Sequence, residues 1–394
     1  MPSVLLALCF LLTSLALLGG TSKTNRCANP LVRKEWWSLE RKERENCITA
    51  PGPQGQCLAN SPNEHTFSPT VNPPDIAPYN ASGSIYDDFV YAHMGKLQRY
   101  TVTIIHFTGL FFPWHRWHLY AVEKALRTRC GYHGTLPYWD WTQGISPVVF
   151  PHVLAHTRID AHHFYESSFF KDSNPKSGLG GWGDASTQFR VLDGALSATS
   201  SFQLSYPFPH TLRRNFTLFG PVEELFPPGF VWNHTRPANA SFTRPIVESL
   251  IDGFVGDFKG FQDRTEGVEG PHLNVHFIVG GIDMGGACPI DAPPGCIGGP
   301  TFSPNDPLFF MHHAMIDRIW FKWQRKHKLN KYAFEGGSVQ TIDDVASYSL
   351  YPTGGPPFLT MDSELPTDGL DEPLSVSDMI STTEGPLCYV YDDE

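Results

Sequence analysis

The histidines of this chain have spacings that point to metal chemistry, beginning with His106 and His115. On one continuous helix, nine residues at about 100° each would put the two imidazoles on opposite faces. Pro113 lies between them and suits the first turn of a new helix, so His106 can end one element while His115 opens the next. Both rings can then face one pocket. Its expected walls are aromatic and dry, built from Phe107, Phe111, Phe112, Trp114 and Trp117.

The second half of the chain carries another candidate pair, His272 and His276, in a helix that we expect to begin at Pro271. Their i,i+4 spacing puts both imidazoles on one helix face, where they can share a metal. The H-E-x-x-H pattern of metalloproteases is absent, because Leu273 follows the first histidine. Downstream, His312 and His313 are adjacent in a predicted helix, so only one of them can face a given metal. Helical periodicity does not decide which.

A further candidate is His93, in a helix predicted from Ser84 with Asp87 three residues on. The buried stripe of this helix would be Ile85, Phe89, His93 and Leu97. A lone histidine there is more often a core residue than a ligand, and the proximity of His106 and His115 in sequence strengthens the ligand interpretation. His152 and His156 have the same i,i+4 spacing but lie in a polar stretch, so we interpret them as surface residues.

The favoured positions give three imidazoles in each half of the chain and no carboxylate or thiolate. They are His93, His106 and His115 in the first half, and His272, His276 and one of His312 or His313 in the second. Imidazole-only sites suit copper, zinc, iron or nickel, and not calcium, magnesium or di-iron carboxylate chemistry. Three ligands leave coordination positions open, as catalysis requires.

The elements that must position these histidines are helices. Two histidine-bearing halves predict two helix pairs facing each other, so we expect a mainly α fold with a four-helix bundle core, long loops and few short strands. The 35 Gly and 34 Pro residues favour many ordered loops. A net charge of −11 without a basic run argues against a nucleic-acid partner.

The N-terminus predicts export. Residues 4–18 are an apolar run too short to cross a bilayer comfortably and are followed by small residues, so we interpret residues 1–20 as a signal peptide and residues 21–394 as one catalytic domain. No later apolar run has membrane length. Glycosylation sequons are expected to be used at Asn80, Asn215, Asn233 and Asn239. The protein is therefore predicted to be soluble, secreted and extracellular.

Seven cysteines remain after the leader, and an oxidising compartment favours disulfides, with one thiol left over. Cys288 and Cys296 bracket a Pro/Gly loop and are the first pair we would expect. The other pairings cannot be deduced from spacing.

Four segments together resemble the tyrosinase/catechol oxidase (polyphenol oxidase) family, most closely its short secreted fungal members. They are the Phe-x-Pro-Trp-His-Arg motif at 111–116, Pro-Tyr-Trp-Asp-Trp at 137–141, the His272/His276 pair and the run from Asp306 to Asp317. In that family, the ligand of the last motif stands four residues before the aspartate. Asp317 therefore selects His313, and His312 becomes its neighbour. The resemblance implies two copper ions, one held by His93, His106 and His115, and the other by His272, His276 and His313.

The resemblance also implies an activity: oxidation of small o-diphenols to o-quinones while O2 is reduced to water. We expect a monomer or weak homodimer with no membrane partner. Tyr389 and Tyr391 resemble the Tyr-x-Tyr mark that closes the catalytic domain in the family, so no C-terminal shielding domain is expected. Residues 335–387 should wrap the core as extended chain.

Three departures from the family pattern bear on specificity. Ile104 stands where many members carry a cysteine joined to the second copper-A histidine, so no thioether is expected there. Leu273 replaces the asparagine that helps a water accept the phenol proton, and Glu269 or Gln262 could hold this water. A weak base means poor monophenol hydroxylation. Pro300, at the gate position, instead suggests an open pocket. The expected substrate pocket contains Leu273, Phe277 and Pro300.

Alternative functions remain. One is a tyrosinase with full monophenolase or o-aminophenol oxidase activity, and another is a hemocyanin-like O2 carrier that uses the same six imidazoles without catalysis. A dizinc hydrolase is disfavoured, because no carboxylate ligand accompanies the histidines.

Overall fold

The computed structural model describes residues 27–49, 54–63, 67–69, 77–96, 103–143, 164–220, 226, 229–230, 232–280 and 300–393. This part of the chain is mainly helical, as expected, with two small two-stranded sheets. The signal-peptide prediction, His152, His156 and the Cys288–Cys296 pair lie outside these residues. The α-helices are α1 (Arg41–Thr49), α2 (Gln54–Ala59), α3 (Ile85–Lys96), α4 (Phe111–Cys130), α6 (Ser168–Lys171), α8 (Arg244–Asp252), α9 (Phe258–Glu266), α10 (Pro271–Gly280), α11 (Leu308–Lys326), α12 (Val345–Leu350) and α13 (Val376–Ile380).

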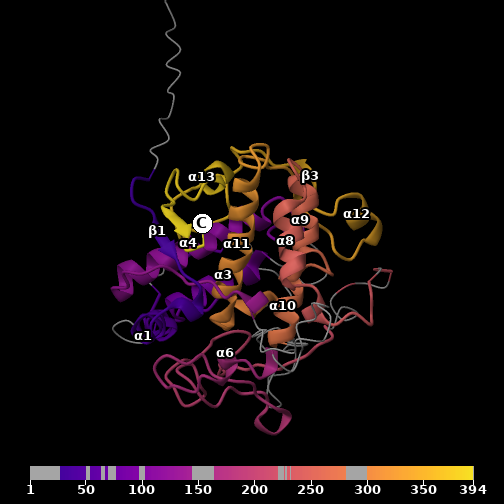
Figure 1. The fold of residues 1–394 in the computed structure, drawn as a ribbon. Coiled ribbons are helices and arrows are strands. Elements are labelled where there is room, and N and C mark those ends of the chain that lie inside the picture. Colours follow the sequence, from indigo (N-terminus) through magenta and orange to yellow (C-terminus); the bar gives the residue numbers. More distant parts are fainter. Residues whose placement is uncertain are drawn as a thin grey trace, which may run out of the picture.

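The histidine-bearing helices pack around α11, which runs through the middle of the molecule (Figure 1). Helix α11 packs against α4, α8 and α10, and α9 packs against α10. Helix α3 packs against the 3-10 segment η6 (Pro300–Asn305), which directly precedes α11. Helices α3, α4, α10 and α11 thus supply the predicted helical core.

The start of α3 follows the sequence prediction. The Asp87 carboxylate accepts hydrogen bonds from the Ser84 N–H (2.8 Å) and hydroxyl (2.7 Å), and the Ser84 hydroxyl oxygen accepts the Asp87 N–H. This reciprocal arrangement satisfies donors that a helix start leaves unpaired. The helix is buried on nearly all sides rather than along one stripe.

Helix α4 begins at Phe111, and Pro113 lies within its first turn, as predicted. It ends at Gly131, whose φ of 61° is the left-handed conformation that glycine adopts easily. His106 does not end a helix. It lies in a bent segment, residues 104–110, where Phe107 has a φ of 52°. The bend nevertheless turns His106 toward His115, so that both rings face one pocket, as predicted.

Two other segments are divided into several short elements. Residues 244–266 form two helices, α8 and α9, because Gly253 and the left-handed Gly256 interrupt the helical path. The described part of residues 27–60 contains a strand, a 3-10 turn and two helices, beginning with β1 (Leu31–Arg33) and η1 (Trp36–Ser38).

The C-terminal segment is less extended than predicted. It contains β2 (Gly337–Val339), paired antiparallel with β3 (Gly355–Phe358), and the helices α12 and α13. Its last strand, β4 (Tyr389–Tyr391), pairs in parallel with β1 near the start of the described chain, and Cys27 forms a disulfide with Cys388 beside it. The two ends therefore close over the same side of the bundle.

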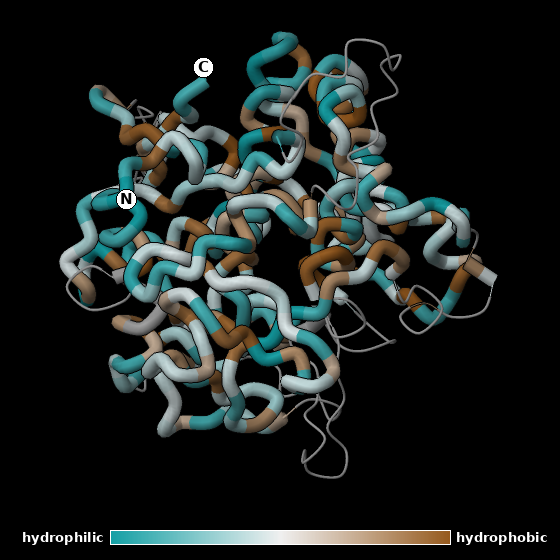
Figure 2. The backbone as a smooth tube through the Cα atoms, turned by 60° about the horizontal axis from the view of Figure 1, so that its bottom comes forward, coloured by the Kyte–Doolittle hydropathy of each residue, from teal (hydrophilic) through white to brown (hydrophobic). Residues whose placement is uncertain are grey.

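A second disulfide joins Cys57 of α2 to Cys130 of α4. Cys47 forms no disulfide with another cysteine in the described part of the chain. Hydrophilic stretches lie mostly along the outer turns of the chain, and strongly hydrophobic ones also run through its middle (Figure 2). Within the described residues, every helix is too short or too polar to cross a membrane.

Candidate metal centre

The structure brings the predicted histidines together as two groups. His93 of α3, His106 of the bend and His115 of α4 form the first, and His272 and His276 of α10 with His313 of α11 lie in the second. Within each group, one nitrogen of every ring lies within 4.8 Å of the others. All six rings are buried except that of His276, which is partly exposed.

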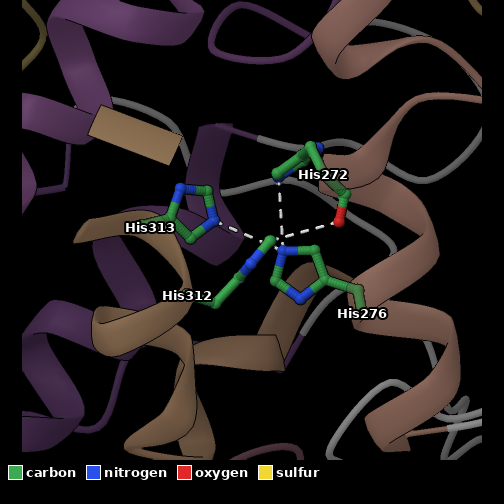
Figure 3. Close-up of side chains that lie close together, drawn as sticks. All are labelled: His272, His276, His312 and His313. Atoms are coloured by element: carbon green, nitrogen blue, oxygen red, sulfur yellow. Dashed lines mark hydrogen bonds between the residues drawn. The ribbon is translucent and has the colours of Figure 1, made fainter. Parts of the chain in front are cut away.

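The second group has the geometry of a metal site. The Nε2 atom of His276 lies 3.3 Å from Nε2 of His272 and 3.3 Å from Nε2 of His313 (Figure 3). Nitrogens 3.3 Å apart subtend about 110° at a metal about 2.0 Å from each, which is the usual metal–imidazole bond length. The Nε2 atom of His276 therefore lies at the spacing that one ion requires from both of the other Nε2 atoms.

His115 shows the same fit in the first group. Its Nδ1–H donates to the Phe111 carbonyl oxygen at 2.7 Å, which leaves the lone pair on Nε2. That Nε2 atom is buried and has no hydrogen-bond partner among the described residues. A buried lone pair without a partner is costly unless it binds something else, so a metal ion fits here.

His312 also lies within 4.8 Å of the second group, but its hydrogen bonds exclude it as a ligand. Its Nδ1 accepts the indole N–H of Trp141 at 3.2 Å, and its Nε2 faces the carbonyl oxygen of His272 at 3.1 Å. A carbonyl can only accept and an indole can only donate. His312 is therefore an Nε2–H tautomer whose one lone pair is already used, and His313 is left as the ligand.

The two groups face each other directly. The rings of His115 and His313 stack with centroids 4.3 Å apart and planes 8° apart, and His106 stacks on His272 at 5.7 Å. Phe111 lies one helical turn before His115, and its ring contacts His272. Phe309 lies one helical turn before His313, and its ring contacts His93. Two metal ions held here would be neighbours in one dry pocket.

Electrostatics keep the imidazoles neutral. Burial lowers the pKa of His106, His115, His272, His276 and His313 well below the usual histidine value, and the neighbouring imidazoles lower it further. Neutral imidazole is the form that binds metals. The donor set contains no anion, so it favours a transition metal over calcium or magnesium.

A buried network supports the bend that carries His106. The Glu266 carboxylate accepts the backbone N–H of Phe107 at 2.6 Å and the side-chain amide of Gln262 at 3.0 Å. The same amide donates to the Thr108 carbonyl oxygen at 2.6 Å. These bonds clamp the left-handed Phe107, directly after His106, to helix α9.

Glu266 is the carboxylate that sequence reasoning missed. Its i+4 spacing from Gln262 placed both on one helix face, and that signal was available in the sequence. Glu269 lies instead at the surface, where it pairs with Arg236 at 2.8 Å and accepts the Asn233 N–H. Gln262 is fully buried, and its Oε1 has no partner among the described residues, so it can still accept a hydrogen bond from water.

Behind the histidines, Asp317 joins the two central helices. Its carboxylate binds Arg116 of α4 at 2.5 Å, Arg33 of β1 at 3.3 Å, and the hydroxyls of Tyr389 and Tyr391 of β4. Arg116 follows His115 directly, and Asp317 stands one turn after His313. The buried charges therefore brace the backs of α4 and α11 and close the chain ends over them.

The remaining predicted residues are placed as follows. Leu273 and Phe277 are buried on α10. Pro300 begins η6. Of the sequons, Asn80 and Asn233 are exposed and Asn215 is half-buried, whereas Asn239 is buried. A glycan on Asn239 would have to displace packed chain, so this site is disfavoured.

The fold and the site together define a helical protein with a dinuclear, all-histidine metal centre. A family model described as the common central domain of tyrosinase matches residues 83–326. Tyrosinase P of Aspergillus terreus is 28% identical, over 94% of this chain and 95% of the relative. Tyrosinase ustQ of Aspergillus flavus is 29% identical, over 95% of this chain and 84% of the relative.

Among solved structures, a polyphenol oxidase variant from Thermothelomyces thermophila shares the fold with a TM-score of 0.59. It is 22% identical and covers 92% of this chain and 88% of its own. The chain belongs to the tyrosinase family, whose members are copper oxidoreductases with two copper ions. The protein is a type-3 copper oxidase.

Proposed function

We propose that this protein is a secreted polyphenol oxidase that converts o-diphenols to o-quinones and hydroxylates monophenols weakly. The observation that carries the proposal is the pair of facing histidine groups in a dry pocket, with Leu273 directly after the first histidine of α10. His93, His106 and His115 would hold one copper ion, and His272, His276 and His313 the other.

Bound copper would supply the redox chemistry and the affinity for O2. The chain supplies the rest. The buried aromatic side chains Phe111 and Phe309 exclude water from between the histidines. The ion pair between Asp317 and Arg116 keeps α4 and α11 in place. Each diphenol gives up two electrons and two protons, and O2 needs four of each to become two waters, so two diphenols should be consumed per O2.

The surroundings of Glu266 support weak action on monophenols. Burial raises the pKa of this carboxyl well above its usual value, although the Phe107 N–H and Gln262 oppose the shift. Burial therefore favours the protonated form, and both oxygens already accept hydrogen bonds. With Leu273 unable to orient a water and Glu266 held in its protonated form, neither residue provides a strong base for the phenol proton.

A substrate panel on the copper-loaded protein tests the proposal: 4-tert-butylcatechol, catechol, tyrosine, tyramine and o-aminophenol, followed by quinone absorbance and O2 consumption. We expect fast catechol oxidation at two diphenols per O2, and slow hydroxylation of tyrosine. Tyrosine hydroxylation as fast as catechol oxidation would make the protein a full tyrosinase. Reversible O2 binding without quinone would indicate a carrier.

Secretion belongs to the same proposal and is supported by the apolar leader and by the exposure of Asn80 and Asn233. Expression in a eukaryotic secretory host should yield medium-borne protein whose mass falls on endoglycosidase treatment. Asn80→Gln and Asn233→Gln should each remove one glycan, and Asn239→Gln none.

A further inference from the structure

Two further buried histidines, His118 and His312, belong to neither predicted ligand set. Both lie on helices that carry a ligand: His118 on α4 with His115, and His312 on α11 with His313. Both are almost fully buried. Spacing left His312 open as an alternative ligand to His313 and assigned no role to His118.

Their hydrogen bonds follow one pattern. His118 Nε2 lies 3.2 Å from the carbonyl oxygen of Phe89 on α3, and His312 Nε2 lies 3.1 Å from the carbonyl oxygen of His272 on α10. A carbonyl oxygen can only accept, so both histidines donate an Nε2–H. The His118 bond joins α4 to α3, and the His312 bond joins α11 to α10. Each bond therefore links two helices that carry ligands of the same group.

The two accepting carbonyls occupy equivalent places. In an α-helix, the carbonyl of residue i accepts the N–H of residue i+4. Phe89 stands four residues before His93, and His272 stands four residues before His276, and both pairs lie within their helices. Each carbonyl thus serves the backbone N–H of a ligand histidine and uses its second lone pair for the auxiliary histidine.

We propose that His118 and His312 are matched positioning residues, each of which holds the two helices that share one copper ion at the separation the ion requires. They touch no substrate or metal. His118 acts on the group of His93, His106 and His115, and His312 on the group of His272, His276 and His313. Trp141 fixes the tautomer of His312 by donating to its Nδ1.

Copper affinity, measured by chelator competition and metal content, tests this role without reference to turnover. His312→Phe and His118→Phe keep an aromatic ring but remove the donor, and each should weaken one copper ion by about 10-fold to 100-fold. His312→Gln can both donate to the His272 carbonyl and accept from Trp141, and His118→Gln can donate to Phe89. Both should bind copper nearly as the wild type does.

Single-site backgrounds show which ion is affected. In a His115→Gln background, only the α10/α11 ion should remain tightly bound, so adding His312→Phe should weaken it and adding His118→Phe should not. The pattern should reverse in a His313→Gln background. Tyr86→Phe is the matched control. It removes a buried hydrogen bond from α3 to the Pro304 carbonyl (2.7 Å) and should leave both copper affinities unchanged.

Several results would overturn the inference. Folded His118→Phe and His312→Phe proteins, checked by circular dichroism, with wild-type copper affinity would show that the bonds do not position ligands. A His312→Gln protein that loses copper as His313→Gln does would make His312 itself a ligand. The inference rests on the ligand sets proposed above. Their failure would be seen separately, as a wild-type protein that does not bind two copper ions.

Discussion

Replacing Asp317 by asparagine should destabilise the copper-free protein strongly without changing side-chain size. The carboxylate is almost fully buried and forms ion pairs with Arg116 and Arg33. Removing one partner of a buried ion pair costs about 3–5 kcal/mol, because a charge is left uncompensated. Arg116 keeps its bonds to the Met379 and Ile380 carbonyls, and Arg33 keeps Glu123, so we expect the lower value, about 3 kcal/mol.

That free energy converts to a measurable shift in melting temperature. An unfolding entropy of about 2.1 cal/mol/K per residue over 394 residues gives about 0.8 kcal/mol/K, so 3 kcal/mol corresponds to about 4 °C. The assay is thermal and denaturant unfolding of the apo-protein at pH 7. Asp252→Asn is the matched control. Asp252, at the end of α8, forms an exposed ion pair with Lys326, at the end of α11, and its replacement should change the free energy of unfolding by less than about 1 kcal/mol.

The pH dependence of this pair has a defined sign. Burial raises the pKa of Asp317, but Arg116 and Arg33 outweigh it and hold the pKa below the usual range. The stabilisation is therefore present above the unfolded pKa and is lost as pH falls through the folded value. If the Asp317→Asn protein melts within 1 °C of the wild type at pH 7, the Asp317 ion pairs do not hold α4 and α11 together.

Three further predictions concern specificity, pH and metal. Leu273→Asn should raise tyrosine hydroxylation relative to catechol oxidation by roughly 10-fold to 100-fold, because the amide can orient a water as base; product analysis measures the ratio. Burial raises the pKa of Glu35 from 4.5 to about 7, with Asp140 adding and the Trp37 N–H opposing. The stabilisation from protonated Glu35 is thus present at low pH and lost as pH rises through 7. Between pH 5 and 8, the free energy of unfolding of Glu35→Gln should therefore rise relative to that of the wild type by up to about 3 kcal/mol. Removing copper with a chelator from protein held at a free copper concentration of 100 times the Kd should lower the free energy of unfolding by about 3 kcal/mol per ion.

Each of these has a contradicting outcome. A Leu273→Met control that matches Leu273→Asn in hydroxylation ratio would show that the amide is not the cause. Parallel pH profiles of unfolding for Glu35→Gln and the wild type would mean that Glu35 titrates normally in the folded state. Equal melting curves before and after chelation would mean that the ions do not bind the native state preferentially.

The local signals of the sequence predicted the helix starts and the gathering of the histidines well. The Ser84/Asp87 cap, Pro271 and Pro113 act through nearby backbone groups, so their effect is visible from sequence. His272 and His276 share a face by helix geometry alone. Their expected meeting with His106 needed only that the two halves of the chain face each other.

The choices that depended on distant partners could not be made from spacing. His312 and His313 were indistinguishable by periodicity, and only the Trp141 indole and the His272 carbonyl show that the lone pair of His312 is used. Glu269 and Gln262 were named as candidates to hold the water and Glu266 was not, because nothing local shows that Arg236 draws Glu269 to the surface. The disulfide between Cys27 and Cys388 likewise depends on β1 meeting β4.

The most direct test of the central claim is a crystal structure with anomalous diffraction measured at the copper edge. We predict two copper peaks in one pocket. One should lie about 2.0 Å from nitrogens of His93, His106 and His115, and the other about 2.0 Å from Nε2 of His272, His276 and His313. A single copper peak, or a copper ion bound by His312 in place of His313, would contradict the account.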